Sequence, residues 1–336
     1  MSIGPVSNSH REISVVEPVS PALERVKTML FKPFDLGKWF AIGFCAWLAQ
    51  LGEGGVGGGF GNSFNGFSGG NQNHVSDSLR SVFGQARDFT LNNLDWIIPV
   101  AAFLILFCLA LWLVFLWLSS RGRFMFLHCV ALDRAEVGVP WEKFAREANS
   151  LFLFRIVMGL IGLVMTLPPV VFIVVLVLRM VLSGRPDMAA IMIAIGLFLI
   201  LLFTAIIFAL IRKFTMDFVV SILFLRGGKC LAAWREFLGL LKQHAGLFAL
   251  YILFQIVLGL AIGIIVTMAL IATCCFCCLA LLPYIGTVVL LPVLVFQRAY
   301  SLCFFAQFGP IYDVFPPRFS RSAAGRVANA GRDMTL

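Results

Sequence analysis

The sequence predicts an all-α integral membrane protein with about six transmembrane helices, and its composition and apolar run lengths are the reasons. Apolar residues make up 60% of its 336 positions and charged residues 13%, with a mean hydropathy of +0.95. Soluble domains carry about 25% charged residues. The apolar residues also occur in runs of about 20, the length that a helix needs to cross ~30 Å of hydrocarbon. Runs such as 188–211 do not alternate polar and apolar residues, which disfavours a β-barrel.

The N-terminal residues 1–20 are polar and lack the apolar core of a secretory signal, so we expect a disordered cytoplasmic N-terminus. A basic segment with apolar residues at helical spacing follows over 21–34 and predicts an amphipathic helix. The first candidate span, 34–51, is the weakest of the six because Asp35 and Lys38 shorten its apolar part. It leads into a Gly/Phe/Asn-rich stretch.

That glycine-rich stretch, residues 53–74, predicts a flexible external loop, because ordering glycine costs much conformational entropy. It lacks the Lys-Ser/Thr ending of a phosphate-binding loop and does not follow a strand, so nucleotide binding is not expected. Residues 75–89 then place apolar side chains at helical spacing, which predicts a short helix on the outer surface.

Five further apolar runs predict the other spans: 96–118, 151–178, 189–211, 246–272 and 279–296. Pro168 and Pro169 lie in the middle of the third span and should kink or break it, since proline removes a backbone donor. Gly259 and Gly263 form a small-xxx-small pair that would let another helix approach the fifth span closely. The sixth span contains two prolines, Pro283 and Pro292.

The basic residues are distributed very unevenly about these spans. Of the 26 Lys and Arg residues, 22 lie on one side and only Arg80, Arg87, Arg179 and Arg185 lie on the other. Because Lys and Arg concentrate in cytoplasmic segments, the sequence predicts a multi-pass protein of the cytoplasmic (inner) membrane with both termini cytoplasmic. The membrane domain would cover residues 21–311, and residues 312–336 would form a cytoplasmic tail.

Two cytoplasmic segments resemble each other. Each begins with basic and aromatic residues at the end of a span, at 121–126 and 212–218, and continues to a Trp and a Phe three residues apart. A truncated third copy follows the sixth span at 298–305, and the start of the chain can supply its missing half. This repeat predicts three helical hairpins joined by amphipathic helices at the cytoplasmic interface. The alternative is that any interfacial segment acquires Trp, Phe and Arg.

Basic and Trp side chains at the inner ends of the spans are candidates for binding anionic lipid headgroups, because such a membrane surface attracts Lys and Arg. These candidates are Arg121, Arg123, Trp141, Arg212, Lys213, Trp234 and Arg298.

No catalytic or metal motif stands out. The histidines His10, His74, His128 and His244 are scattered without a partner at i+3 or i+4, so we expect no metal site among them. His-Glu-x-x-His, nucleophile-elbow and kinase motifs do not occur. The nearest acidic residue to a span interior, Asp217, lies just past Arg212 and Lys213 and can pair with them. We therefore expect no enzyme activity, no cofactor and no nucleic-acid partner.

A cysteine cluster, Cys274, Cys275, Cys277 and Cys278, lies in the short hairpin between the fifth and sixth spans. Four thiols could bind a metal, but a CC-x-CC run cannot easily wrap tetrahedrally around one ion. Adjacent Cα atoms are also only about 3.8 Å apart, short of the usual disulfide range of about 4.4–6.8 Å. The favoured interpretation is a tight turn built from small apolar side chains.

Three stretches carry a resemblance to a known family: Pro-Phe-Asp-Leu-Gly-Lys-Trp at 33–39, Pro-Tyr-Ile-Gly-Thr-Val at 283–288 and Phe-Ala-Gln-Phe-Gly-Pro at 305–310. With the Gly-rich loop, they resemble an uncharacterised family of archaeal and bacterial polytopic membrane proteins of unknown function. The chain is more loosely similar to the membrane domain of bacterial glycerophosphodiester phosphodiesterases. No catalytic domain follows it here, so the resemblance does not imply that activity.

These features favour a non-catalytic scaffold, lipid-binding or assembly role in the membrane. The expected partners are the lipid bilayer, anionic headgroups, and a membrane protein or a second copy of the chain. The alternative function is a transporter or channel-like permease that uses its Pro-kinked helices, since broken helices line transporter sites. A transporter predicts polar side chains converging on the kinks, whereas a scaffold predicts a dry packed core.

Overall fold

The computed structural model describes residues 13–32, 34–51, 94–183, 188–272 and 283–315. The Gly-rich loop, the segment 75–89 and the cysteine cluster at 274–278 lie outside these ranges. Within the described ranges all regular secondary structure is helical and no strand occurs. The all-α fold class is therefore confirmed.

Four helices are long and apolar enough to cross a membrane: α4 (Leu94–Leu132), α6 (Ala145–Ser183), α7 (Met188–Phe214) and α10 (Ala245–Ala272). They contain the second to fifth expected spans and indicate a membrane protein. α4 and α6 have 39 residues each, which is about 58 Å at 1.5 Å per residue. This length exceeds the ~30 Å of a hydrocarbon core, so each of these two helices is longer than a crossing along the membrane normal requires.

The first and sixth expected spans correspond to shorter helices. The first is α2 (Leu36–Gln50), with 15 residues. The sixth falls on α12 (Pro283–Val289) and α13 (Leu291–Ala306), which meet at Leu290. Pro283 is the first residue of α12, and Pro292 lies in the first turn of α13. Proline suits a first turn because it has no N–H to leave unbonded there. Both prolines thus lie at helix starts.

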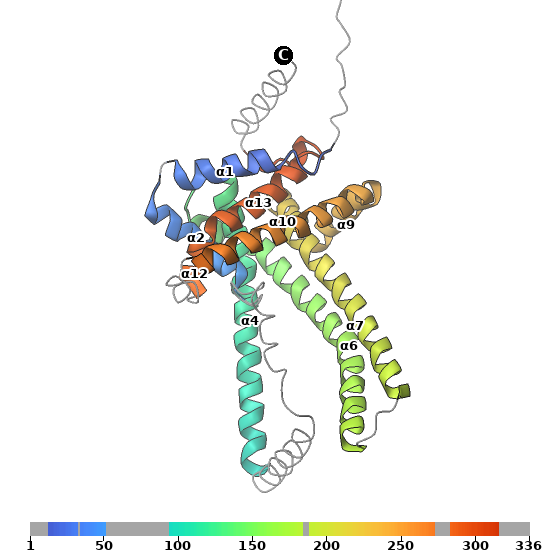
Figure 1. Ribbon diagram of the computed structural model, residues 1–336. Helices are drawn as coiled ribbons and strands as arrows, with labels where there is room; N and C mark the ends of the chain where they lie inside the picture. The colour runs from blue at the N-terminus through green and yellow to red at the C-terminus, as the bar shows by residue number, and fades with distance from the viewer. Residues whose placement is uncertain (1–12, 33, 52–93, 184–187, 273–282, 316–336) are drawn as a thin grey trace, which may run out of the picture. The chain divides into compact units, whose positions relative to one another are not determined.

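The double proline does not break the third span. α6 stays helical through Pro168 and Pro169, although each of them lacks the N–H that would bond to the preceding turn. Figure 1 shows α6 changing direction along its length. A helix can thus absorb the two missing hydrogen bonds by bending.

The chain divides into two compact units. Unit 1 comprises Met1–Ala49, Gly122–Glu147 and Thr215–Leu336, and unit 2 comprises Gln50–Arg121 and Ala148–Phe214. Unit 1 thus holds the last residues of α4 together with these further helices: α1 (Val19–Phe31), α2, α5 (Gly138–Lys143), the π-helix η2 (Thr215–Val219), α8 (Val220–Arg226), α9 (Cys230–Gln243), α10, α12, α13 and the short 3-10 helix η3 (Pro310–Tyr312).

Aromatic rings fill the core of unit 1, and Phe218, Phe237, Phe248 and Phe304 are fully buried there. The two segments related by the sequence repeat make the same kind of contact. Phe124 stacks on Phe144 with ring centroids 5.8 Å apart, and Phe218 stacks on Phe237 at 5.3 Å. In each segment a ring near or just past the end of a long helix therefore packs on the Phe three residues after the Trp.

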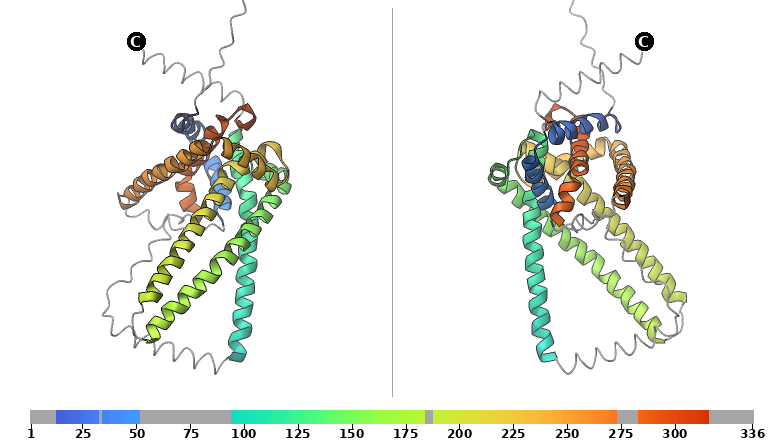
Figure 2. Two further views of the ribbon diagram at one scale, coloured as in Figure 1. Left: turned by 90° about the vertical axis from the view of Figure 1, so that its right-hand side faces the viewer. Right: turned by 60° about the vertical axis from the view of Figure 1, so that its left-hand side comes forward.

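The start of the described chain packs against its end. α1 lies against α13, whose first turns belong to the last expected span (Figures 1 and 2). The buried face of α1 consists of Ala22, Arg25, Val26, Met29 and Leu30. The two ends of the described chain thus form one helix pair.

α2 crosses the end of α4 at an unusually short distance. A Cβ added to Gly122 would lie 2.6 Å from backbone atoms of both Leu48 and Ala49, so only glycine fits there. Farther along the same two helices, the buried Cys45 and Cys129 place their sulfur atoms 3.9 Å apart. This crossing fixes α2 to unit 1.

Unit 2 has little buried interior among its described residues. In the most apolar 18-residue windows of α4, α6 and α7 no residue is buried. α6 and α7 run side by side (Figures 1 and 2), and the position of a Cβ on Gly162 lies 3.5 Å from the Phe208 ring. Exposed side chains such as Phe103, with 70% of its surface accessible, suit hydrocarbon rather than water.

Candidate functional site

A π-helix interrupts the chain where α7 passes into α8. It covers Thr215–Val219, and it places Asp217 in the core of unit 1. A π-helix shifts the backbone hydrogen bonds from i→i+4 to i→i+5 and is frequent at functional sites. Two carbonyls of this turn accept side-chain hydrogen bonds: Arg298 of α13 donates through Nη1 to Met216, and the hydroxyl of Ser221 donates to Asp217 at 2.8 Å. These bonds stabilise the distorted turn.

The Asp217 carboxylate accepts a hydrogen bond from α10. Asp217 is only 8% exposed, and Tyr251 donates its hydroxyl to Oδ2 at 2.9 Å. Gln255 in turn donates from Nε2 to the Tyr251 hydroxyl at 3.0 Å. Tyr251 and Gln255 are four residues apart and therefore share one face of α10. A chain of two hydrogen bonds thus connects α10 to the π-helix.

Charged side chains surround the Asp217 carboxylate and the π-helix. The negative charge of Asp217 attracts the guanidinium of Arg298, while the positive charge of Arg123 opposes it. Arg298 also places Nη2 at 3.4 Å from the Ser221 hydroxyl. A buried charge is costly unless it is paired and hydrogen-bonded, and the Asp217 carboxylate has the Tyr251 hydrogen bond and the attraction of Arg298. We call this set the Asp217 cluster: Asp217, Ser221, Tyr251, Gln255 and Arg298.

Aromatic rings enclose the Asp217 cluster. The Tyr251 ring stacks on Phe304 at 4.6 Å and on Tyr300 at 5.8 Å, and its other neighbours include Phe218 at 5.1 Å. Tyr251, Tyr300 and Phe304 are fully buried. Hydrogen bonds and charge pairs are stronger in such a low-dielectric environment than in water. The cluster therefore ties the π-helix, α8, α10 and α13 into one junction within unit 1.

The chemistry of the Asp217 cluster is that of a structural junction. The hydrogen bonds that Tyr251, Gln255, Ser221 and Arg298 donate end on other members of the cluster or on the backbone of the π-helix. Nowhere in the described ranges do three His, Cys, Asp or Glu side chains group so as to hold a metal ion. The geometry favours holding helices together over binding a ligand.

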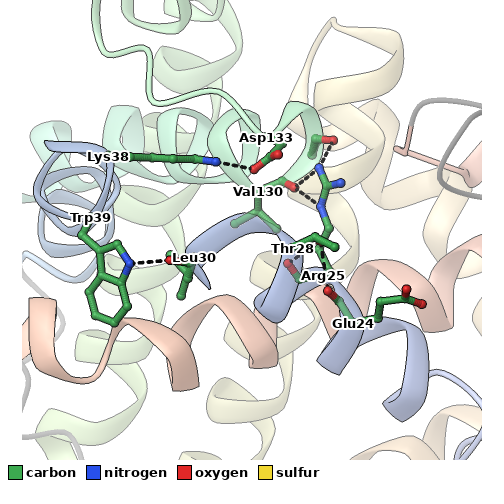
Figure 3. A network of polar contacts seen from close by, with 9 residues as sticks. Glu24, Arg25, Thr28, Leu30, Lys38, Trp39, Val130 and Asp133 are labelled. Carbon is green, nitrogen blue, oxygen red and sulfur yellow. Dashed lines mark hydrogen bonds and ion pairs between the residues drawn. The ribbon is translucent and has the colours of Figure 1, made fainter. Parts of the chain in front are cut away.

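A second polar network attaches α1 to the C-terminal end of α4 (Figure 3). Arg25 donates from Nε and Nη2 to the carbonyl of Val130, at 3.0 and 2.9 Å, and from Nη2 to that of Ala131 at 2.8 Å. These carbonyls belong to the last turn of α4 and have no partner within the helix. A cation at a helix C-terminus also complements the helix dipole. Burial lowers the pKa of Arg25, and the charge of Asp133 counteracts that shift.

Two further contacts extend this network to α2. Lys38 forms an ion pair of 2.9 Å with Asp133, which directly follows α4, and Trp39 donates its indole N–H to the carbonyl of Leu30 at 2.8 Å (Figure 3). Trp39 also packs edge-on against Phe31. We call Arg25, Lys38, Trp39 and Asp133 the α1 clasp. It fixes α1 and α2 around one helix end.

The seven lipid-facing candidates occupy different environments. Arg212 is exposed, while Arg121, Arg123, Trp141, Lys213, Trp234 and Arg298 are half-buried. The Arg121 guanidinium lies over the Trp117 ring at 4.6 Å, and Trp234 packs edge-on against Phe237. Arg298 binds the π-helix, so its protein contact was not foreseen from the sequence.

The helix-packing candidates Gly259 and Gly263 lie on α10 with open space around them. A Cβ at either position would meet no atom within 4 Å of the described chain.

Sequence reasoning placed Asp217 at the interface beside Arg212 and Lys213, whereas the structure buries it and provides Tyr251 as its hydrogen-bond donor. Tyr251 and Ser221 were not recognised at all. One signal was available: Tyr251 and Gln255 place two polar groups on one face of an otherwise apolar helix.

Comparison with known proteins gives one family. The chain belongs to a family of unknown function (DUF7544), whose model matches residues 13–282. No curated protein and no solved structure matches the chain.

Proposed function

We propose that this member of a family of unknown function is a non-catalytic membrane scaffold, which holds lipids or other membrane proteins around its apolar helices. The observation that carries the proposal is that the polar side chains of its long helices bond within the protein, while the apolar surfaces stay uncovered. Such a molecule offers apolar helix surface and basic ends to its surroundings.

The hydroxyls near the middle of the spans support a scaffold over a transporter. Thr166 and Thr204 each donate at 2.8 Å to the carbonyl four residues earlier in their own helix, Gly162 and Ile200 respectively. Thr166 is close to the double proline, where a transporter would present polar groups to a substrate. A permease stays the second candidate, and substrate-dependent uptake into proteoliposomes would establish it.

Hydrogen bonds between α4 and α6 in unit 2 also support a scaffold. Arg155 of α6 donates to the hydroxyls of Ser119 and Ser120 on α4 at 3.2 and 3.3 Å, and Trp117 donates to Asn149 at 3.2 Å. These hydrogen bonds join the part of α4 around residues 117–120 to the part of α6 around residues 149–155. We propose that these contacts lie at the cytoplasmic interface of an inner membrane, where Trp and Arg concentrate.

The proposed topology has six crossings arranged as three hairpins, with both termini in the cytoplasm. Its first and sixth crossings would use α2 and the pair α12–α13, together with residues outside the described ranges. The 22 to 4 distribution of basic residues supports it.

Anionic headgroups are the proposed ligands of the basic helix ends. Arg121 and Arg123 lie near the end of the predicted second span, and Arg212 and Lys213 lie at the end of α7. A basic residue near an anionic membrane surface contributes about 1 kcal/mol. Partners that share the apolar surfaces would be other membrane proteins or a second copy of the chain.

Lipid retention tests this proposal. A variant with Arg121, Arg123, Arg212 and Lys213 changed to Gln should retain several-fold less phosphatidylglycerol through purification, as measured by lipid mass spectrometry. The matched control changes the four predicted external residues Arg80, Arg87, Arg179 and Arg185 to Gln and should retain the normal amount. Equal retention by the two variants would refute headgroup binding at the cytoplasmic ends.

A further inference from the structure

α9 is a helix with two distinct faces. Its buried face contains Cys230, Ala233 and Phe237, and Phe237 stacks on Phe218 in the core. The remaining exposed surface contains a stripe at positions i, i+4, i+7 and i+11: Leu231, Arg235, Leu238 and Lys242. Leu231 is 60% and Leu238 41% accessible. The stripe therefore alternates apolar and basic side chains along one line.

Such a stripe is typical of a helix that lies in the plane of a membrane surface. Leucine side chains enter the boundary between headgroups and acyl chains, and basic residues on the same helix attract anionic lipids. Arg and Lys can do both, because their long aliphatic stems lie on apolar surface while their charges reach the headgroups.

The position of α9 in the chain places it at such a surface. It ends at Gln243, and only His244 separates it from the membrane-length helix α10. The C-terminal turn of α9 is therefore tethered to a helix that we propose crosses the bilayer. Lys229, Arg235 and Lys242 give this segment the positive charge of a cytoplasmic interface.

α1 carries the same arrangement. Ala22, Val26 and Met29 are buried, whereas Leu23, Lys27 and Phe31 are exposed at intervals of four residues. α1 also precedes an expected span. Both α1 and α9 thus expose alternating apolar and basic side chains along one face.

We propose that the exposed face of α9 binds the surface of an anionic bilayer, with Leu231 and Leu238 inserted below the headgroups and Arg235 and Lys242 on their phosphates. This inference rests on the proposed function, because it requires α10 to span the membrane. The proposed function places anionic lipid at the basic ends of the long helices. This inference adds α9 as a helix that lies in the plane of the membrane surface.

Photocrosslinking to lipid tests the proposal on the full chain. A benzophenone amino acid would replace Leu231 or Leu238 in protein reconstituted into vesicles of phosphatidylcholine and phosphatidylglycerol. Mass spectrometry would then identify the lipids attached after illumination. The same probe at Phe203, an exposed residue of α7, reports whether a spanning helix is in lipid.

We expect lipid adducts at all three positions. At Leu231 and Leu238 phosphatidylglycerol should exceed its share of the vesicle at least about threefold, because each nearby basic residue favours anionic lipid. Changing both Arg235 and Lys242 to Gln should remove that excess and leave the Phe203 adducts unchanged. The reciprocal variant, Arg235→Lys with Lys242→Arg, should preserve it.

Adducts at Phe203 without adducts at Leu231 and Leu238 would overturn the α9 proposal and leave the scaffold proposal standing. An excess of phosphatidylglycerol that survives the double Gln variant would also overturn it. Absence of adducts at all three positions would overturn both proposals.

Discussion

Units 1 and 2 differ in how much of their structure protein contacts bury, although the most apolar window of α10, in unit 1, is also only 6% buried. Unit 1 buries aromatic rings, a carboxylate and a guanidinium against one another, and two of its helices touch at backbone distance at Gly122. In unit 2 the most apolar windows of α4, α6 and α7 contain no buried residue. Protein contacts therefore specify the aromatic core of unit 1, whereas the long helices of unit 2, like α10, depend on their surroundings for cover. Substitutions should have large effects in the first and small effects in the second.

Matched glycine substitutions test this difference with the largest expected effect. Gly122→Ala should lower the free energy of unfolding by about 3 kcal/mol, because a side chain there forces α2 and α4 apart. At Gly159 of α6 no atom lies within 4 Å of the added Cβ, so Gly159→Ala should be neutral or stabilise by up to about 1 kcal/mol. Denaturant titration in detergent measures both values. Equal losses would remove the distinction between the units.

Removing one hydroxyl from each unit should give the next largest difference. Tyr251→Phe deletes the donor to the buried Asp217 carboxylate and should cost about 2 kcal/mol, since it leaves a buried charge short of a hydrogen bond. Thr204→Val removes an exposed hydroxyl that bonds only within its own helix. It should change stability by less than about 0.5 kcal/mol. A neutral Tyr251→Phe variant would show that the Asp217 cluster does not support unit 1.

The α1 clasp should respond to a conservative change. Arg25→Lys retains the charge but cannot reproduce the three guanidinium hydrogen bonds to Val130 and Ala131. We expect a loss of about 1.5 kcal/mol in denaturant titration. Lys27→Arg, on the exposed face of the same helix, is the control and should be neutral. If both variants unfold at the same denaturant concentration, Arg25 does not hold α1 to α4.

The ion pair between Lys38 and Asp133 should contribute least. Its side chains are 16% and 38% accessible, and partly exposed pairs contribute at most about 1 kcal/mol. Lys38→Ala should therefore lower stability by less than 1 kcal/mol, and added salt should reduce the difference from the parent protein. A loss as large as that of Gly122→Ala would mean that charge, rather than close packing, fixes α2.

The sequence allowed prediction of the features that depend on local pattern. Apolar runs of about 20 residues predicted α4, α6, α7 and α10. The π-helix, the Tyr251 contact and the backbone crossing at Gly122 depend on residues far apart in the chain. Gly122 lies between two arginines in a segment whose basic charge suggested lipid contact, and no local pattern reveals that α2 packs against it.

The prolines also show that a local sequence pattern does not decide the backbone geometry by itself. Pro168 and Pro169 predicted a kink or a break; α6 stays helical through them and changes direction along its length, so no break occurs. Pro283 and Pro292 were expected inside a single span, whereas they begin α12 and lie in the first turn of α13. A proline in the sequence shows where the backbone lacks an N–H donor. The packing around it decides whether the helix bends there or starts there.

Reporter fusions that distinguish cytoplasm from exterior test the central claim, a scaffold that crosses the membrane six times with its basic segments inside. Fusions after Arg134, Lys229 and Arg326 should report the cytoplasm, and fusions near Gly70 and Arg185 should report the exterior, because 22 of the 26 basic residues lie on the predicted inner side. An external signal at Lys229 would contradict the six-crossing arrangement and, with it, the placement of α9 at the cytoplasmic surface.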